Sequence, residues 1–177
     1  AISNENSALI DSTLRSRILA PTQNNRLTYN VNYRFSDTLG NELTFDADRI
    51  AFSSAGTNTL ENQRFDTGQV LQGKDVFLSD IGSDITVWSL KADYVKNRKN
   101  GLKLESGAKV NWTNSNNDIQ STREDDGISQ PDAGRSNRFD YRENIAAVYA
   151  NIGRQGEKIN WQLGLRAERT EVNGNST

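Results

Sequence analysis

Acidic residues offer the first candidates for chemistry in this chain of 177 residues. The stretch REDDG, from Arg123 to Gly127, places three carboxylates before a glycine. A calcium loop needs the spacing D-x-D-x-D-G and a distal glutamate, and REDDG has neither. We therefore expect a solvated loop here and no bound metal.

Two further groups of charged residues could in principle do acid–base chemistry. Asp46 and Asp48 form a close pair, and Glu105 lies four residues before Lys109. Paired carboxylates can act as general acid and base. All four residues, however, fall on the polar face of predicted strands, where charged side chains are typical of a hydrated wall. The hydrated wall is the favoured interpretation.

The chain contains neither histidine nor cysteine. Their absence excludes nucleophile–histidine arrangements, thiolate or imidazole metal ligands, and disulfides. We therefore expect no enzymatic activity, and we predict no catalytic, cofactor-binding or metal-binding residue.

Composition excludes other classes of protein. The chain has 21 Lys and Arg residues against 23 Asp and Glu residues, so no excess of positive charge indicates nucleic-acid binding. Only 34% of the residues are hydrophobic, which is less than a packed interior usually has. No run of about 18 apolar residues predicts a transmembrane helix. Because the chain begins at Ala1 without Met, we expect that a preceding segment has been removed.

Side chains that alternate between apolar and polar dominate from Arg26 onward. A period of two is typical of a β-strand with one apolar and one polar face. The pattern predicts an all-β fold, an antiparallel up-and-down meander of about six long strands. They lie within RLTYNVNYRF, ELTFDADRIAF, TVWSLKADYV, LKLESGAKVNW, ENIAAVYANI and GEKINWQLGLRAERTEV.

The connections between these strands alternate in length. SDTLGN, KNRKN and GRQGE are short and carry Gly or Asn suited to hairpin turns. The connections over 53–84 and 113–137 are long and polar. Long loops count against a compact soluble domain, whereas short periplasmic turns and long extracellular loops are typical of an outer-membrane barrel. We expect one domain, an incomplete β-barrel over 26–177, after a loop or irregular lead-in over 1–25.

The apolar faces fit a bilayer in length and in aromatic content. A tilted transmembrane strand needs about 9 to 11 residues, as Leu27–Phe35 and Leu102–Trp112 provide. We expect the aromatic residues to form two bands, one at each bilayer interface. The band near the short turns comprises Tyr33, Phe35, Tyr94 and Trp161, and the band near the long loops comprises Trp88, Trp112, Phe139 and Tyr141.

Two details accompany the barrel interpretation. In ENIAAVYANI, we assign Ile145, Ala147 and Tyr149 to the apolar face, with Glu143 at its rim. Arg49 interrupts the apolar series of its strand, and a cation near the bilayer midplane costs about 2 to 4 kcal/mol. We attach to Arg49 the hypothesis of a bulge or an early exit from the bilayer.

The open alternative to the barrel is a soluble, surface-exposed β-sandwich that binds a glycan or a protein.

Two stretches, FDYRENI at Phe139–Ile145 and GLRAERTE at Gly164–Glu171, are the most specific part of a resemblance that covers residues from Arg26 onward. These residues resemble the barrel of TonB-dependent receptor-like outer-membrane proteins of the Bacteroidetes type. The resemblance implies a Gram-negative outer-membrane location, a plug inside a barrel of about 22 strands, and uptake of a ligand or nutrient energised by a TonB-type complex.

The chain departs from that family in strand number. Six strands cannot close a barrel, because the smallest has eight, and no plug or TonB box is seen. We therefore expect a fragment of a barrel that contacts outer-membrane lipid in its parent protein. Bare sheet edges and an uncovered apolar face should make the fragment associate with itself.

Overall fold

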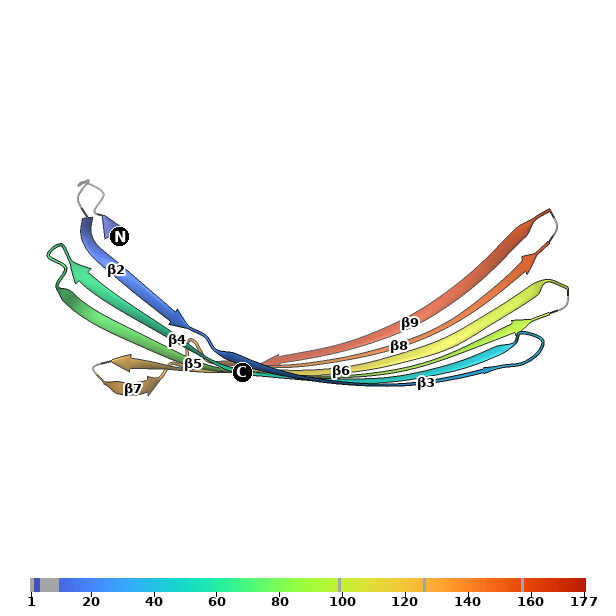
Figure 1. The fold of residues 1–177 in the computed structure, drawn as a ribbon, viewed down its shortest axis with the longest axis horizontal. Helices are drawn as coiled ribbons and strands as arrows, with labels where there is room; N and C mark the ends of the chain where they lie inside the picture. The colour runs from blue at the N-terminus through green and yellow to red at the C-terminus, as the bar shows by residue number, and fades with distance from the viewer. Residues whose placement is uncertain (1, 4–9, 99, 126, 157) are drawn as a thin grey trace.

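The computed structural model describes residues 2–3, 10–98, 100–125, 127–156 and 158–177. These residues form one curved antiparallel sheet with no second layer (Figure 1). Its strands are β1 (Ile2–Ser3), β2 (Ile10–Leu19), β3 (Thr22–Ser36), β4 (Glu42–Asp66), β5 (Leu71–Asn97), β6 (Leu102–Asp125), β7 (Ile128–Pro131), β8 (Asn137–Gln155) and β9 (Asn160–Ser176).

Strands β2 and β3 together form one long strand along a single edge of β4. β3 pairs with β4 from Ser36 to Thr22, and β2 continues the pairing from Leu19. The interruption falls at Pro21, which has no N–H to donate to a ladder. Its carbonyl oxygen instead accepts a 3.3 Å hydrogen bond from the backbone N–H of Thr57.

Strands β7 and β8 repeat this arrangement along β6. β6 pairs with β8 as far as Ile119 and with β7 from Thr122 onward. Residues 132–136 bulge out between the two partners and are fixed at Ser121, whose hydroxyl donates to the carbonyl of Arg135 at 3.1 Å. Counted this way, the sheet consists of six long strands in up-and-down order plus the short β1, so the predicted meander is confirmed.

Two predictions about irregular segments are wrong for the described residues. The lead-in predicted over 1–25 is in strand from Ile10 onward. The two predicted long loops are mostly strand, because β4 continues to Asp66, β5 begins at Leu71 and β6 continues to Asp125. Backbone ladders satisfy the N–H and C=O groups there, so these segments form sheet without an apolar stripe of bilayer length.

The short connections are tight turns, as predicted. In the turn between β3 and β4, the Asp37 carboxylate accepts hydrogen bonds at 2.9 Å from the backbone N–H groups of Leu39 and Asn41. Gly40 has φ +76°, a left-handed conformation that favours glycine. Gly101 has φ +77° in the turn between β5 and β6. Glu157, in the third turn, lies outside the described residues.

Nearly every side chain of the sheet is accessible. Among the described residues only Ala147 and Ser121 are buried. A sandwich would bury the residues between its two layers, so the single layer does not support the β-sandwich alternative. No helix among the described residues is long and apolar enough to cross a membrane.

Candidate functional site

The strand register separates the side chains into two faces. Residues opposite each other in paired strands point to the same face, so one row can be followed across the sheet. It runs through Tyr33, Phe45, Ala92, Ala108, Val148 and Ala167. We call the face that carries this row the band face and the opposite one the network face.

The network face carries pairs of polar side chains that bridge neighbouring strands. The amide of Asn32 donates to Asp46, and that of Asn30 donates to Asp48. Elsewhere the Arg34 guanidinium lies 2.6 Å from Glu42. Cross-strand polar pairs of this kind stabilise a sheet whose surface is hydrated.

Tyr149 is the largest member of this network. Its hydroxyl donates a 2.6 Å hydrogen bond to Asp93, two strands away on β5. The ring crosses β6 at Gly107, where a Cβ atom would overlap it. Asp93 also forms an ion pair with Lys91 on its own strand.

This position of Tyr149 corrects the face predicted for β8. Tyr149 pairs with Gly107, Ala147 with Lys109, and Ile145 with Asn111, so all three lie on the network face. Glu143 shares that face and therefore is not at the rim of the apolar face. The band-face residues of β8 are Ala146, Val148, Ala150 and Ile152.

The apolar residues of the band face stop at different points on successive strands. We call this stretch the apolar band, the short-turn end of the sheet the turn end, and the opposite end the hairpin end. At the hairpin end the band stops at Leu27 on β3, at Trp88 on β5, at Trp112 on β6 and at Ala167 on β9.

The steady shift of this boundary measures the strand tilt. Through the register, Ala167 corresponds to Tyr33 on β3, and Leu27 lies six residues beyond Tyr33. The boundary thus moves by about 1.2 residues at each of the five steps from β3 to β9. With about 3.4 Å per residue and about 4.8 Å between strands, the tilt is about 40°. Strands of membrane barrels are tilted by about 35–45°.

Arg49 lies at the hairpin-end boundary of the band. It pairs with Tyr29 and Trp88, and Trp88 pairs with Trp112, so Arg49 belongs to a row of interfacial aromatics. The guanidinium carbon lies 5.4 Å from the centre of the Trp88 ring. The register is continuous through Arg49, so the hypothesis of a bulge is wrong. The row of aromatics favours the alternative, an early exit from the bilayer.

The predicted aromatic bands are only partly correct. Tyr33, Phe35 and Tyr94 lie on the band face near the short turns, and Trp161 shares that face with Leu163. Trp88 and Trp112 lie on it at the hairpin end. Phe139 and Tyr141 lie on the network face instead, because they pair with Asn117 and Ser115.

Beyond the apolar band the character of the two faces reverses. The band face there carries polar residues such as Asp84, Asn116 and Asp140. The network face there carries apolar residues among polar ones, beginning with two cross-strand pairs that we call the hairpin-end patch: Ile50 with Val87 and Phe52 with Ile85. A reversal at one oblique line is expected where a wall leaves a bilayer, since only the bilayer requires an apolar outer face.

The acidic candidates of the sequence do not form one site. Asp46 and Asp48 accept hydrogen bonds from Asn32 and Asn30 in the network, and the Glu105 carboxylate lies 2.5 Å from the amino group of Lys103. Asp126 of REDDG lies outside the described residues. Arg123 of the same stretch lies 2.8 Å from Asp75 on β5. Among the described residues, no cluster of three or more carboxylates is placed to hold a metal ion.

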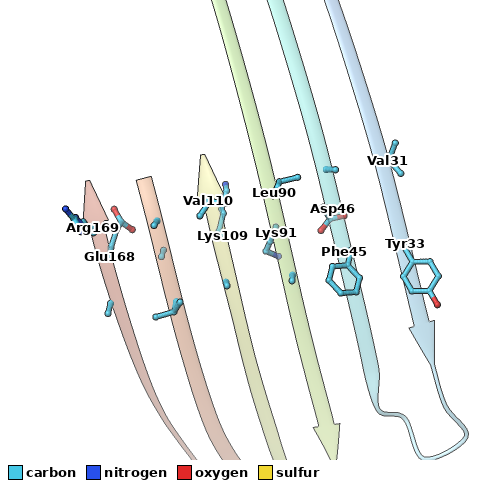
Figure 2. A pocket seen from close by; sticks show the side chains of 17 residues that line it. Val31, Tyr33, Phe45, Asp46, Leu90, Lys91, Lys109, Val110, Glu168 and Arg169 are labelled. Carbon is cyan, nitrogen blue, oxygen red and sulfur yellow. The ribbon is translucent and has the colours of Figure 1, made fainter. Parts of the chain in front are cut away.

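A depression of about 760 Å³ lies over the apolar band. It crosses the strands from β3 to β9, and Figure 2 shows Val31 and Tyr33 on β3, Phe45 on β4, Leu90 on β5, Val110 on β6 and Arg169 on β9 along it. Most of its lining surface is apolar, although charged residues such as Asp46, Lys91 and Arg169 also line it.

A tilted single-layer wall, with one apolar stripe bounded by aromatics and one hydrogen-bonded polar face, defines the class of transmembrane β-barrel proteins. A comparison with family models agrees with this class of protein. Residues 34–177 match the model described as the outer membrane protein beta-barrel family, and the chain belongs to that family. It is therefore a section of a barrel wall in the outer membrane. No match was found among curated proteins.

Proposed function

We propose that the protein carrying this chain takes up a ligand or nutrient across the outer membrane as a TonB-dependent receptor-type barrel, without enzymatic activity. The observation that carries the proposal is the reversal of the two faces. The reversal gives the barrel interior a hydrated wall within the bilayer and the apolar hairpin-end patch beyond it. Such an interior suits capture of a solute above the membrane followed by passage along a polar path.

Two further observations support this proposal. The strands continue well beyond the apolar band, and β5 alone has 27 residues, where about 9 to 11 span a bilayer. A large extramembrane wall is suited to capturing a ligand. The energised mechanism rests on the resemblance of Phe139–Ile145 and Gly164–Glu171 to TonB-dependent receptors.

The proposed receptor requires further strands to close its barrel and a complex that energises uptake. The described sheet has open edges at β3 and β9, each of which pairs with one strand. Neighbouring strands of the full barrel would cover these edges, and an isolated section would associate with itself through them. Outer-membrane lipid and a TonB-type complex are the proposed partners, and nucleic acid is not among them.

Uptake by cells tests the proposal. Strains with and without the full-length protein are grown in a defined mixture of nutrients, and depletion of each nutrient is measured by mass spectrometry. We expect at least one nutrient to be depleted only when the protein and the TonB-type complex are both present. Depletion that continues without the complex would indicate a passive channel, and depletion that is equal without the protein would exclude uptake.

A matched pair of variants connects uptake with the hairpin-end patch. Phe52→Ser removes a ring from the patch, whereas Ser53→Ala changes the neighbouring residue on the opposite face. We expect the first variant to assemble in the outer membrane but to deplete the nutrient more slowly, and the second to behave like the unchanged protein. Equal uptake by both variants would exclude the patch as a contact for the ligand.

A further inference from the structure

We propose that three arginines far toward the hairpin end of the network face bind the ligand that is taken up, and that this ligand carries more than one carboxylate or phosphate group. We call Arg64, Arg123 and Arg135 the arginine cluster. The inference rests on the proposed function and names the chemical class of its ligand. The short turns of such barrels are periplasmic, so the cluster belongs to the extracellular part of the interior wall.

The arginine cluster is built around two residues of β5. Phe77 pairs with Arg123 on β6 and lies on the network face. The guanidinium carbon of Arg135 lies 3.8 Å from the centre of the Phe77 ring, and that of Arg123 lies 5.6 Å from it. The Asp75 carboxylate lies 2.8 Å from Arg123 and 3.7 Å from Arg64. Three guanidinium groups from different parts of the chain thus meet at one place on the sheet.

Ser121 fixes the bulge that carries Arg135. Its side chain is buried, and its hydroxyl donates to the carbonyl of Arg135 at 3.1 Å and lies 2.8 Å from the hydroxyl of Ser79. The backbone N–H of Ser121 donates to the hydroxyl of Ser136 at 2.9 Å, and its carbonyl accepts from the backbone N–H of Asp132 at 2.8 Å. A residue that is held in place beforehand loses less conformational entropy on binding. The bulge therefore presents Arg135 in a position prepared for a ligand.

The guanidinium groups of the cluster retain donors for a ligand. The side chains of Arg123 and Arg135 are 48% and 50% exposed. The Nε atom of Arg135 lies 3.6 Å from Asp132, but a guanidinium carries five N–H donors, which one carboxylate does not use up. Stacking on an aromatic ring occupies the flat face of a guanidinium. Its edge stays available for bidentate hydrogen bonds to a carboxylate or phosphate.

Charge favours an anion over a cation as the ligand. The cluster has three positive charges, and the two carboxylates that contact it belong to Asp75 and Asp132. The residues in line with Phe77 on the neighbouring strands β2, β4 and β7 are uncharged: they are Ile18, Leu60 and Gln130. A cation would have to displace the arginines from both carboxylates, whereas an anion binds their remaining donors and is attracted by their field.

Binding of small anions to the full-length protein tests the inference. The probes are tricarballylate, which carries three carboxylates, and inorganic pyrophosphate, which represents phosphate ligands. The trimethyl ester of tricarballylate has the same skeleton without the charges. Binding to the protein in phosphatidylcholine nanodiscs is measured by isothermal titration calorimetry. We expect at least one anion to bind and the ester not to bind. Arg123→Gln and Arg135→Gln should each weaken binding of that anion by about tenfold.

Arg138→Gln is the matched control. Arg138 also lies toward the hairpin end and is paired with an aspartate, since its Nε atom lies 3.4 Å from Asp140. It pairs with Asp118 in the ladder, however, and therefore lies on the band face. The variant removes the same charge from the same end of the sheet but leaves the cluster unchanged. We expect it to bind the anions normally.

Three results would overturn the inference: neither anion binds, the ester binds as well as tricarballylate, or Arg138→Gln loses as much binding as Arg135→Gln. Each variant is first checked for assembly in the outer membrane, so that a misfolded protein is not counted as a loss of binding.

The calorimetric measurement needs neither cells nor a TonB-type complex, so its outcome is separate from that of the uptake experiment. Anion binding by a protein that depletes no nutrient would count against the proposed uptake alone. Depletion of uncharged nutrients by a protein that binds neither anion would overturn this inference alone.

Discussion

The hydroxyl of Tyr149 on β8 donates a 2.6 Å hydrogen bond to the carboxylate of Asp93 on β5, and the tyrosine ring lies across Gly107 on the intervening β6. One side chain thus connects three strands of a sheet that has almost no buried residues. In a single-layer wall, cross-strand contacts of this kind replace the packing that a core provides elsewhere.

Tyr149→Phe should destabilise the barrel by about 1.5–3 kcal/mol, because it removes a hydrogen bond to a charged group. The measurement is guanidinium unfolding of the full-length protein in lipid vesicles. Tyr94→Phe is the control, since Tyr94 lies on the band face. A similar loss in both variants would mean that the hydrogen bond to Asp93 contributes nothing specific.

Gly107→Ala should destabilise the same protein by about 1–3 kcal/mol, because the new methyl group overlaps the Tyr149 ring and forces it to move. Gly82 on β5 has open space around its Cβ position. Gly82→Ala should therefore be neutral or stabilising by at most about 1 kcal/mol. Unfolding curves of the two variants, compared side by side, check this difference. It would be contradicted if Gly107→Ala were as stable as the unchanged protein.

Ala92→Arg should cost about 2–4 kcal/mol, because it places a cation in the middle of the apolar band. Ser89 lies on the same strand but on the network face, opposite Asp48 and Asn111. Ser89→Arg should be tolerated there, in a hydrated environment. Folding yields and unfolding midpoints in vesicles distinguish the two variants. Equal tolerance of both would contradict the assignment of the band face to lipid.

The turn at Asp37 should make a pH-dependent contribution to stability. Hydrogen bonds from the Asn41 side chain, and then from the backbone of the turn, hold the pKa of the Asp37 carboxyl below its ordinary value. A lowered folded-state pKa means that the carboxylate stabilises the fold above about pH 3.9. This contribution is lost as the pH falls through the folded-state pKa.

Asp37→Asn should therefore be less stable than the unchanged protein at pH 7 and equally stable in strong acid. Unfolding midpoints measured across this pH range check the prediction. A constant difference between the two proteins at every pH would show that the charge of Asp37 is not responsible.

The alternation of apolar and polar residues was enough to predict the strands of this protein and their order from the sequence. Leu27–Phe35 has one apolar residue at every second position, and this pattern correctly predicted a strand with a lipid-facing and a hydrated side. The number of long strands, their up-and-down order and the tight turns between them followed from the same pattern and from the positions of Gly and Asn. Pairing is local in a meander, so neighbours in sequence become neighbours in space.

The tertiary structure decided which face each residue of β8 occupies. Residues 145–150 read IAAVYA and are apolar at both parities, so a period of two could not choose between them. Pairing of Tyr149 with Gly107 fixed the choice, because a shift of one residue would exchange the two faces.

The structure also decided that the polar stretches beyond the bilayer are sheet and not loop. A strand in hydrocarbon must be apolar on one face, and that requirement is visible in sequence. Beyond Trp88 and Trp112 the requirement ends, and backbone hydrogen bonds between β5 and β6 continue the sheet as far as Glu124 with polar residues on the band face. Those hydrogen bonds depend on the partner strand, and a single segment of sequence does not reveal them.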